Sequence, residues 1–452
     1  GVAVAVNVVD LTNEAVISPT ADVEATGVDV RALMNTADTV TPNEHTFYAK
    51  ATSGAGDSGS DVGIAGSFAM NLIDDTSQAL IQTGADVDAG GNVNISAANT
   101  TKTTAIATSD ASGDVGIGAS VALNIADTNK TFAKIENGAV LTGAGNVSVT
   151  ASGNHSFTTT AEAGSAGGSV SISPSVALTI ADNDTTALIG TSATVLDASG
   201  TVLVQATHRG KATTLSDGSA AGSVGVGIAV AINDTNDIVT AQVSRDLWAG
   251  GTVTIRTDSL SSTSTTAKAS AAGGSSGDND ANTEAENQLD QGRSHTSESG
   301  DAPDATASDG SGGSSDVGVA AAVAVNMSDS ETHAKLTDNV YGTTGAGSSS
   351  GKLTVESKND TDAQAEADGS STESSVGIGA AVAINLVDLT NEAVIGAVSV
   401  EASGVDVKAL MNAADTVTPN THTFSAKATS GAGATSVGIA GSFAMNLIDD
   451  TT

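Results

Sequence analysis

The sequence predicts an all-β protein, a parallel β-solenoid built from tandem modules of about 54 residues. Three observations predict this class. One segment, Val376 to Asp388, recurs along the chain, and its branched and very small side chains alternate with the two-residue period of a β-strand. There are 51 glycines and only 5 prolines, so turns are plentiful and strands are uninterrupted. No stretch has helical spacing.

The recurring segment defines the long strand of each module. Its copies are Val62 to Asp74, Val115 to Asp127, Val170 to Asp182, Val224 to Asn236, Val317 to Asp329 and Val437 to Asp449, with a truncated copy from Gly1 to Asp10. We predict that both faces are buried, the branched face and the Gly/Ala face. Another sheet could approach the small face more closely than the usual spacing of about 10 Å.

The rest of a module is predicted from turn signals. An Asp three residues after the Asn of the long strand marks a turn, followed by a short strand such as Glu392 to Ile395. Then come a Gly-x-Val-x-Val/Ile strand, as at Gly91 to Ile95, and a Thr/Ser/Ala strand, as at Ser156 to Ala163. The last strand and the next long strand resemble a hairpin. We therefore favour one wide coil per module over about two and a half narrow coils, and a solenoid over a closed barrel or propeller.

The modules group into a larger block of six, because residues 1–75 return almost unchanged at about 379–450. Two insertions interrupt the pattern, a loop at 34–46 and an acidic Ser/Gly-rich stretch at 273–316, which we predict to be a flexible excursion. The predicted modules are 1–61 with the first insertion, 62–114, 115–169, 170–223, 224–316 with the second insertion, 317–375, 376–436 and the start of another at 437–452.

The charge excludes some classes of function. A net charge of -36 leaves no basic face for a phosphate backbone, so we expect no nucleic-acid partner. The chain has no cysteine, which excludes disulfides and thiolate metal sites. We find no signal peptide and no apolar run of about 18 residues, and so expect no membrane insertion. Because the sequence starts part-way through a module, we expect it to belong to a longer protein.

The array resembles a known family. The pattern Val-Gly-Ile-Gly-Ala-Ser-Val-Ala-Leu-Asn124, then Thr-x-Ala-x-Ile, Gly-x-Val-x-Val and a Thr/Ser strand, is similar to the repeats of giant bacterial filamentous adhesins, of the filamentous-haemagglutinin-like and leukotoxin types. The resemblance covers nearly the whole chain, and it is specific as an array rather than as a single copy. It implies a secreted β-solenoid at the cell surface, acting in adhesion or as an extracellular fibre. The amino-terminal secretion domain of that family is absent from this sequence.

The candidate site residues are polar positions that recur in every module. One Asn closes each long strand, and we predict a structural ladder of hydrogen-bonded amides, with ligand binding as the alternative. The ladder comprises Asn7, Asn71, Asn124, Asn233, Asn326, Asn385 and Asn446, with Thr179 as the exception. The Asp row three residues on either caps turn amides or holds cations such as Ca²⁺. The calcium candidates are Asp127 and Asp182, and Asp278 and Asp280 in the second insertion.

Other chemistry finds little support in the sequence. The equivalent His45 and His422 have different neighbours, Glu44 and Thr421, and we interpret them as surface histidines rather than an acid–base pair. Trp248, the only tryptophan, is interpreted as a local packing feature rather than a sugar platform. We therefore expect no catalytic residue and no required cofactor.

These observations favour a structural extracellular fibre or stalk of a bacterial surface, which associates with itself end to end or laterally. The alternative is an adhesin whose insertions at 34–46 and 273–316 bind a glycan or protein on a host or neighbouring cell. A β-helical polysaccharide enzyme would need an acidic cluster with basic and aromatic neighbours in a groove. Thr-rich faces such as Thr100 to Thr104 would also fit ice or mineral binding.

Overall fold

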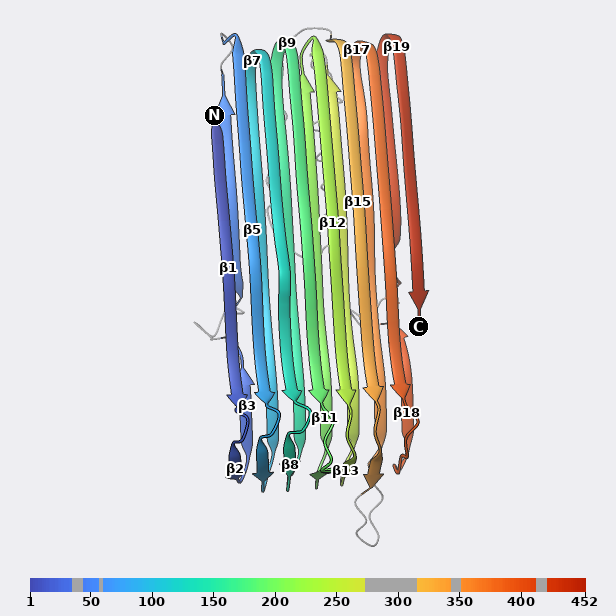
Figure 1. Cartoon of the computed structure of the whole chain (residues 1–452). Coiled ribbons are helices and arrows are strands. Elements are labelled where there is room, and N and C mark those ends of the chain that lie inside the picture. The colour runs from blue at the N-terminus through green and yellow to red at the C-terminus, as the bar shows by residue number, and fades with distance from the viewer. Residues whose placement is uncertain (35–43, 57–59, 273–314, 343–350, 412–420) are drawn as a thin grey trace.

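The computed structural model describes residues 1–34, 44–56, 60–272, 315–342, 351–411 and 421–452. Within these ranges the prediction of an all-β chain is confirmed: long parallel strands lie side by side in stacked parallel sheets (Figure 1). Most of the insertions at 34–46 and 273–316 lies outside the described residues.

Each repeat runs down one long strand, crosses at the lower end of Figure 1, and returns up a second long strand. The strands that only descend are β1 (Val2–Ile17), β5 (Val62–Ile81), β12 (Val224–Val243) and β15 (Ser315–Leu336). Those that only ascend are β3 (Val28–Ala32), β4 (His45–Ala55), β11 (Val202–Ala221), β14 (Val253–Ala272) and β18 (Val405–Met411). Four strands ascend, bend sharply and descend: β7 (Val93–Ile135), β9 (Val147–Ile189), β17 (Leu353–Ile395) and β19 (Phe424–Thr451).

Short strands make the crossing at the lower end. They are β2 (Asp22–Ala25), β6 (Asp86–Ala89), β8 (Val140–Thr142), β10 (Leu196–Ala198), β13 (Leu247–Ala249) and β16 (Val340–Gly342). They form two further parallel sheets, in the orders β2-β6-β8 and β10-β13-β16. The sequence patterns did not predict these strands, because each has only three or four residues.

The modules stack in register. The Val residues that open the long strands pair with one another from layer to layer: Val62, Val115, Val170, Val224, Val317, Val376 and Val437. One module therefore forms one layer, and its two long strands make the arm that the hairpin interpretation predicted.

The turn predicted at the Asp of each module was wrong. β5 continues without a break through Asp74 to Ile81, and its side chains keep alternating between the two faces. Asp74 falls on the outer face, where water can solvate a carboxylate, so nothing forces the chain to turn. The Gly-x-Val-x-Val and Thr/Ser/Ala segments are likewise parts of a single ascending strand, as in the first half of β7.

The interior has two parts with different side chains. At the lower end, where the crossing strands complete a three-sided section, the core is filled by Val, Ile and Leu, including Ile81, Val87, Val93 and Ile135. Higher in the arm, the two long sheets enclose clusters made only of Ala, such as Ala229, Ala267 and Ala320. The narrow arm needs small side chains because only two sheets bound it.

Glycine marks where the two sheets come closest. A Cβ atom added at Gly118 would collide with the backbone oxygen of Gly164 in the facing strand, and one at Gly227 with that of Ser270. The Gly/Ala face of the long strand is thus covered by another sheet at close range, as its small side chains predicted.

The branched face of the long strand lies on the outside, which corrects the prediction that both faces are buried. In the descending half of β7, Ala122 and Asn124 are buried, whereas Val121, Leu123 and Ile125 are only partly covered on the outer face. The bulkier residues cannot enter the narrow arm, so they stand outward.

Candidate functional site

The recurring Asn residues line up inside the arm and are hydrogen-bonded in series. The side-chain Nδ2 of Asn7 donates to Asn71 Oδ1 at 2.8 Å, and Asn71 Nδ2 donates to Asn124 Oδ1 at 2.7 Å. A second run links Asn233 to Asn326 at 2.9 Å, Asn326 to Asn385 at 2.8 Å, and Asn385 to Asn446 at 2.8 Å. The inner members are fully buried.

Several of these amides also tie the two sheets together. Asn71 Nδ2 donates to the backbone oxygen of Thr104 at 2.8 Å, in addition to its bond along the stack. Asn124 Nδ2 donates across the arm twice, to the backbone oxygen of Thr158 at 2.7 Å and to the hydroxyl of Thr159 at 2.9 Å, so both hydrogens of each of these amides are used. This arrangement matches a structural ladder and leaves these amides no donor for a ligand.

Thr179 interrupts the row. Its hydroxyl bonds to the hydroxyls of Thr159, at 2.6 Å, and Thr214, at 2.7 Å, instead of to an amide in the next layer. As a result, Oδ1 of Asn233 is buried without a hydrogen-bond partner. The break thus has a local cost that a continuous row would avoid.

A second buried polar row lies four or five residues further along the long strands, and the sequence reasoning missed it. It consists of Asp75, Asn129, Asn183 and Asp237, which are paired in register. Asn129 donates to Asn183 at 2.8 Å, and Asn183 donates to Asp237 at 2.7 Å. The signal available in the sequence was a polar residue four positions after the first row in three of the layers, whereas Asn129 lies five positions after Asn124 because the strand pairing is irregular there.

Two histidines of the ascending sheet are buried near this row. The rings of His155 and His208 lie 5.7 Å apart between centroids, and Nε2 of His208 lies 3.2 Å from Asp237 Oδ1. Neither ring nitrogen of His155 has a hydrogen-bond partner among the described residues. Burial and, to a smaller extent, the neighbouring His208 lower the pKa of His155 to about 3, against the opposing effect of Asp237.

Asp237 is held in its charged form. Burial by itself would raise its pKa, but His208 and hydrogen bonds from Ser261 and Asn183 lower it to about 2. Ser261 Oγ lies 2.5 Å from Asp237 Oδ2. The buried carboxylate therefore has its compensating partners inside the arm.

Glycine makes room for the two imidazoles. His155 pairs in register with Gly210, and His208 with Gly153. A Cβ atom at Gly153 would lie 3.2 Å from His155 Nε2, and one at Gly210 would lie 3.0 Å from His208 Nε2. Histidine and glycine alternate between neighbouring layers, so that large rings fit into a space that elsewhere holds Ala, Ser and Thr.

The outer Asp row does not cap turns, because it stands within strands. Asp127 and Asp182 are both exposed, and Asp182 accepts a hydrogen bond from Asn236 Nδ2 at 3.2 Å. Partial burial, together with Asp184 and Asp127, raises the pKa of Asp182. In the described part of the chain, no three His, Asp or Glu side chains are grouped so that they could hold a metal ion. Asp278 and Asp280 lie outside the described residues.

The surface-histidine interpretation was also wrong for His45 and His422. The side chains are 28% and 14% exposed, and Nδ1 of His45 lies 3.1 Å from Asp75 Oδ2. Their partners come from other strands, so neighbours in sequence did not reveal them. Trp248 is 42% exposed on β13, which corrects its interpretation as a packing residue.

Arg245 is another buried group that the sequence did not single out. Its guanidinium donates to the backbone oxygens of Gly190 at 2.5 Å, Ala139 at 2.8 Å and Glu136 at 3.2 Å. Burial lowers its pKa to about 10. The side chain thus joins the crossings of neighbouring layers.

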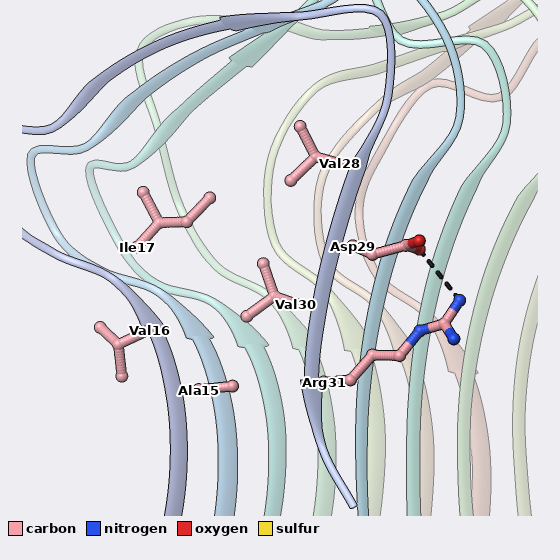
Figure 2. A pocket seen from close by; sticks show the side chains of 7 residues that line it. All are labelled: Ala15, Val16, Ile17, Val28, Asp29, Val30 and Arg31. Carbon is pink, nitrogen blue, oxygen red and sulfur yellow. Dashed lines mark hydrogen bonds and ion pairs between the residues drawn. The ribbon is translucent and has the colours of Figure 1, made fainter.

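A hollow of about 410 Å³ opens where the lower core reaches the first layer. Figure 2 shows Ile17, Val28 and Val30 around it, with Asp29 and Arg31 paired at one side. The ion pair spans 3.1 Å, and both side chains are more than half exposed. Apart from this ion pair, the hollow is lined by apolar side chains at the end of the lower core.

No protein-family model, curated protein or solved structure matches this chain. The candidate site must therefore be judged by its own chemistry. The buried polar rows are satisfied mainly by one another, and they connect layers and sheets. Within the described ranges, no helix is long and apolar enough to cross a membrane.

Proposed function

We propose that this chain is part of a structural extracellular fibre of a bacterial cell surface, built as a parallel β-solenoid. The observation that carries the proposal is the parallel pairing of successive layers from β1 to β19, in register apart from short irregularities near the upper bends and near the Asp row. Backbone ladders and buried amide rows then run along the stacking axis, and no residue has a catalytic role. The resemblance to filamentous adhesin repeats and the acidic, cysteine-free composition support an extracellular setting.

The dimensions favour a broad ribbon over a thin stalk. Each layer adds about 4.8 Å along the stack. A strand of 20 residues, such as β5, extends about 66 Å across it at about 3.3 Å per residue. Each step of about 4.8 Å along the stacking axis thus contains about 54 residues. The fold therefore has wide outer faces and extensive contacts between successive layers.

The test is to change the number of blocks. Residues 62–436 span one six-module period, from Val62 to the residue before the equivalent Val437. Chains with one, two and three copies should give rods of constant width whose length grows by about 29 Å per block, at about 4.8 Å per layer. Electron microscopy measures both dimensions. Separate globules joined by linkers would contradict the proposal.

An adhesin is the second candidate, and the exposed aromatics of the crossing strands favour it. Trp248 pairs in register with Tyr341, and these residues lie side by side on β13 and β16. Adjacent aromatic side chains at a surface can stack on the apolar face of a sugar. Trp248→Ala should then abolish retention on a glycan array while leaving the rod dimensions unchanged. Equal retention would remove this argument for the adhesin.

A further inference from the structure

The outer face of the descending sheet is almost entirely apolar. Six consecutive outward positions on these strands carry Val, Ile, Leu, Met, Phe or small residues in nearly every layer. In the layer of β5 they are Val62, Ile64, Gly66, Phe68, Met70 and Leu72. The register extends each position into a row across the sheet, with Asp234 as a charged exception. We call this surface the apolar face.

The opposite outer surface is polar. On the ascending half of β7, the outward residues include Lys102, Thr104, Thr108 and Asp110. The molecule is therefore a slab with one polar and one apolar outer surface. Such a contiguous apolar surface is unusual on a soluble protein unless something covers it.

The apolar face is large enough for a stable interface. Eight descending strands about 4.8 Å apart, each contributing about ten residues at about 3.3 Å, give roughly 1,100 Å². The largest apolar patch on a typical monomer is about 300–600 Å². Two such faces brought together would bury about 2,200 Å² in total, above the standard size of about 1,600 Å² for specific complexes.

The apolar face is also self-complementary. Its third row is small in several layers, with Gly66, Ala119 and Ala321, and its fourth row is large, with Phe68 and Val121. If a second slab is turned so that its strands run the opposite way, the third row of each copy meets the fourth row of the other. Ridges then enter grooves, as in packed β-sheets.

The same orientation separates the outer Asp rows of the two copies. The outer Asp row, which includes Asp74, Asp329 and Asp388, borders the apolar face on one side only. With antiparallel strands, the two Asp rows lie on opposite borders, about 46 Å apart at about 3.3 Å per residue. That distance exceeds the Debye length of about 8 Å at physiological salt.

We propose that a second copy of this chain packs on the apolar face, face to face and with antiparallel strands. A bilayer fits less well, since the bordering Asp row would repel anionic headgroups. The pairing needs only the apolar face, and it does not depend on the proposed role as a fibre.

The experiment measures mass and accessibility in residues 1–452. Sedimentation should give twice the 43.7 kDa of one chain. Val121→Lys, Val176→Lys and Val230→Lys together place charges side by side in the fourth row and should halve that mass. The matched control is Thr158→Lys, Thr213→Lys and Ser264→Lys, neighbours on the polar surface, which should keep the doubled mass. If the triple lysine variant does not fold, the same three valines can be replaced by threonine. Threonine is similar in shape to valine, and its polar hydroxyl should weaken the pairing.

Thiol labelling identifies the surface that is covered. The chain has no cysteine, so Val230→Cys reports on the apolar face and Thr213→Cys on the polar surface. Labelling of the first should slow in proportion to the paired fraction, and labelling of the second should not change. A single-chain mass at every concentration would overturn the proposal. A doubled mass with Val230→Cys still reactive would also overturn the proposal, because the two chains would then associate through their strand edges. So would flotation of single chains with phosphatidylcholine vesicles, because a bilayer would then cover the apolar face.

Discussion

Removing the buried imidazole of His155 should change how stability depends on pH. In the folded chain, burial keeps His155 neutral until its pKa of about 3, whereas the ordinary pKa is 6.5. Below pH 6.5 His155 therefore binds a proton in the unfolded chain but stays unprotonated in the folded chain. The free energy of unfolding should fall as the pH decreases from about 6.5 to about 3.

The magnitude follows from the gap between the two pKa values. At about 1.4 kcal/mol per pH unit, the full loss is about 5 kcal/mol, and the part between pH 6.5 and 4.5 is about 2.5 kcal/mol. Other groups act in the opposite direction. Burial raises the pKa of Glu162 to about 7 and that of Asp217 to about 6, so their protonation favours the folded chain over the same range. The effect of His155 must therefore be taken as a difference between variants.

The comparison is between the unchanged chain and His155→Gln, unfolded in urea at pH 7.0, 6.0, 5.0 and 4.5. The stability of the unchanged chain relative to the variant should decrease steadily as the pH falls below about 6.5. Ser156→Gln, on the outer face of the same strand, controls for the introduced glutamine. If the unchanged chain and His155→Gln lose stability in parallel, His155 is not the buried neutral group described above.

Three further substitutions test other parts of the fold. Gly118→Val should lower the free energy of unfolding by about 3 kcal/mol or more, because its side chain would push the two sheets apart. Thr104→Val, on the polar outer surface of the same strand, should have little effect, and thermal unfolding measures both. Arg245→Met should cost about 2–4 kcal/mol in urea unfolding, because three backbone oxygens lose their donors; no change would mean that water replaces the guanidinium. Burial, with Glu331 and Asp388, raises the pKa of Asp329 to about 6 from its ordinary value of 3.8. Asp329→Asn should therefore raise the melting temperature at pH 8, and this advantage should shrink progressively as the pH falls from about 6 to about 4; an equal effect at pH 8 and pH 4 would contradict this.

The sequence by itself determined the class of the fold and its repeat. Period-2 alternation and recurring glycine predicted strands, and the recurrence of Asn124 and its equivalents predicted a polar row inside a stack. The small face of the long strand also predicted close contact with another sheet, because only Gly and Ala allow backbones to approach so far. These properties are local to one module, and one module repeats them in every layer.

The tertiary structure decided which face of the long strand turns outward. Alternation distinguishes two faces but does not say which one meets a partner, and hydrophobicity alone would have buried Val121 rather than Ala122. The inward positions of the descending strands in the arm hold mainly Gly, Ala, Ser and Asn, and the branched residues stand outside and form the apolar face. The surroundings of His155, His208 and Asp237 were hidden for a related reason. Their partners lie between about 25 and 55 residues away in the sequence, on facing strands or in neighbouring layers, and only the tertiary structure brings them together.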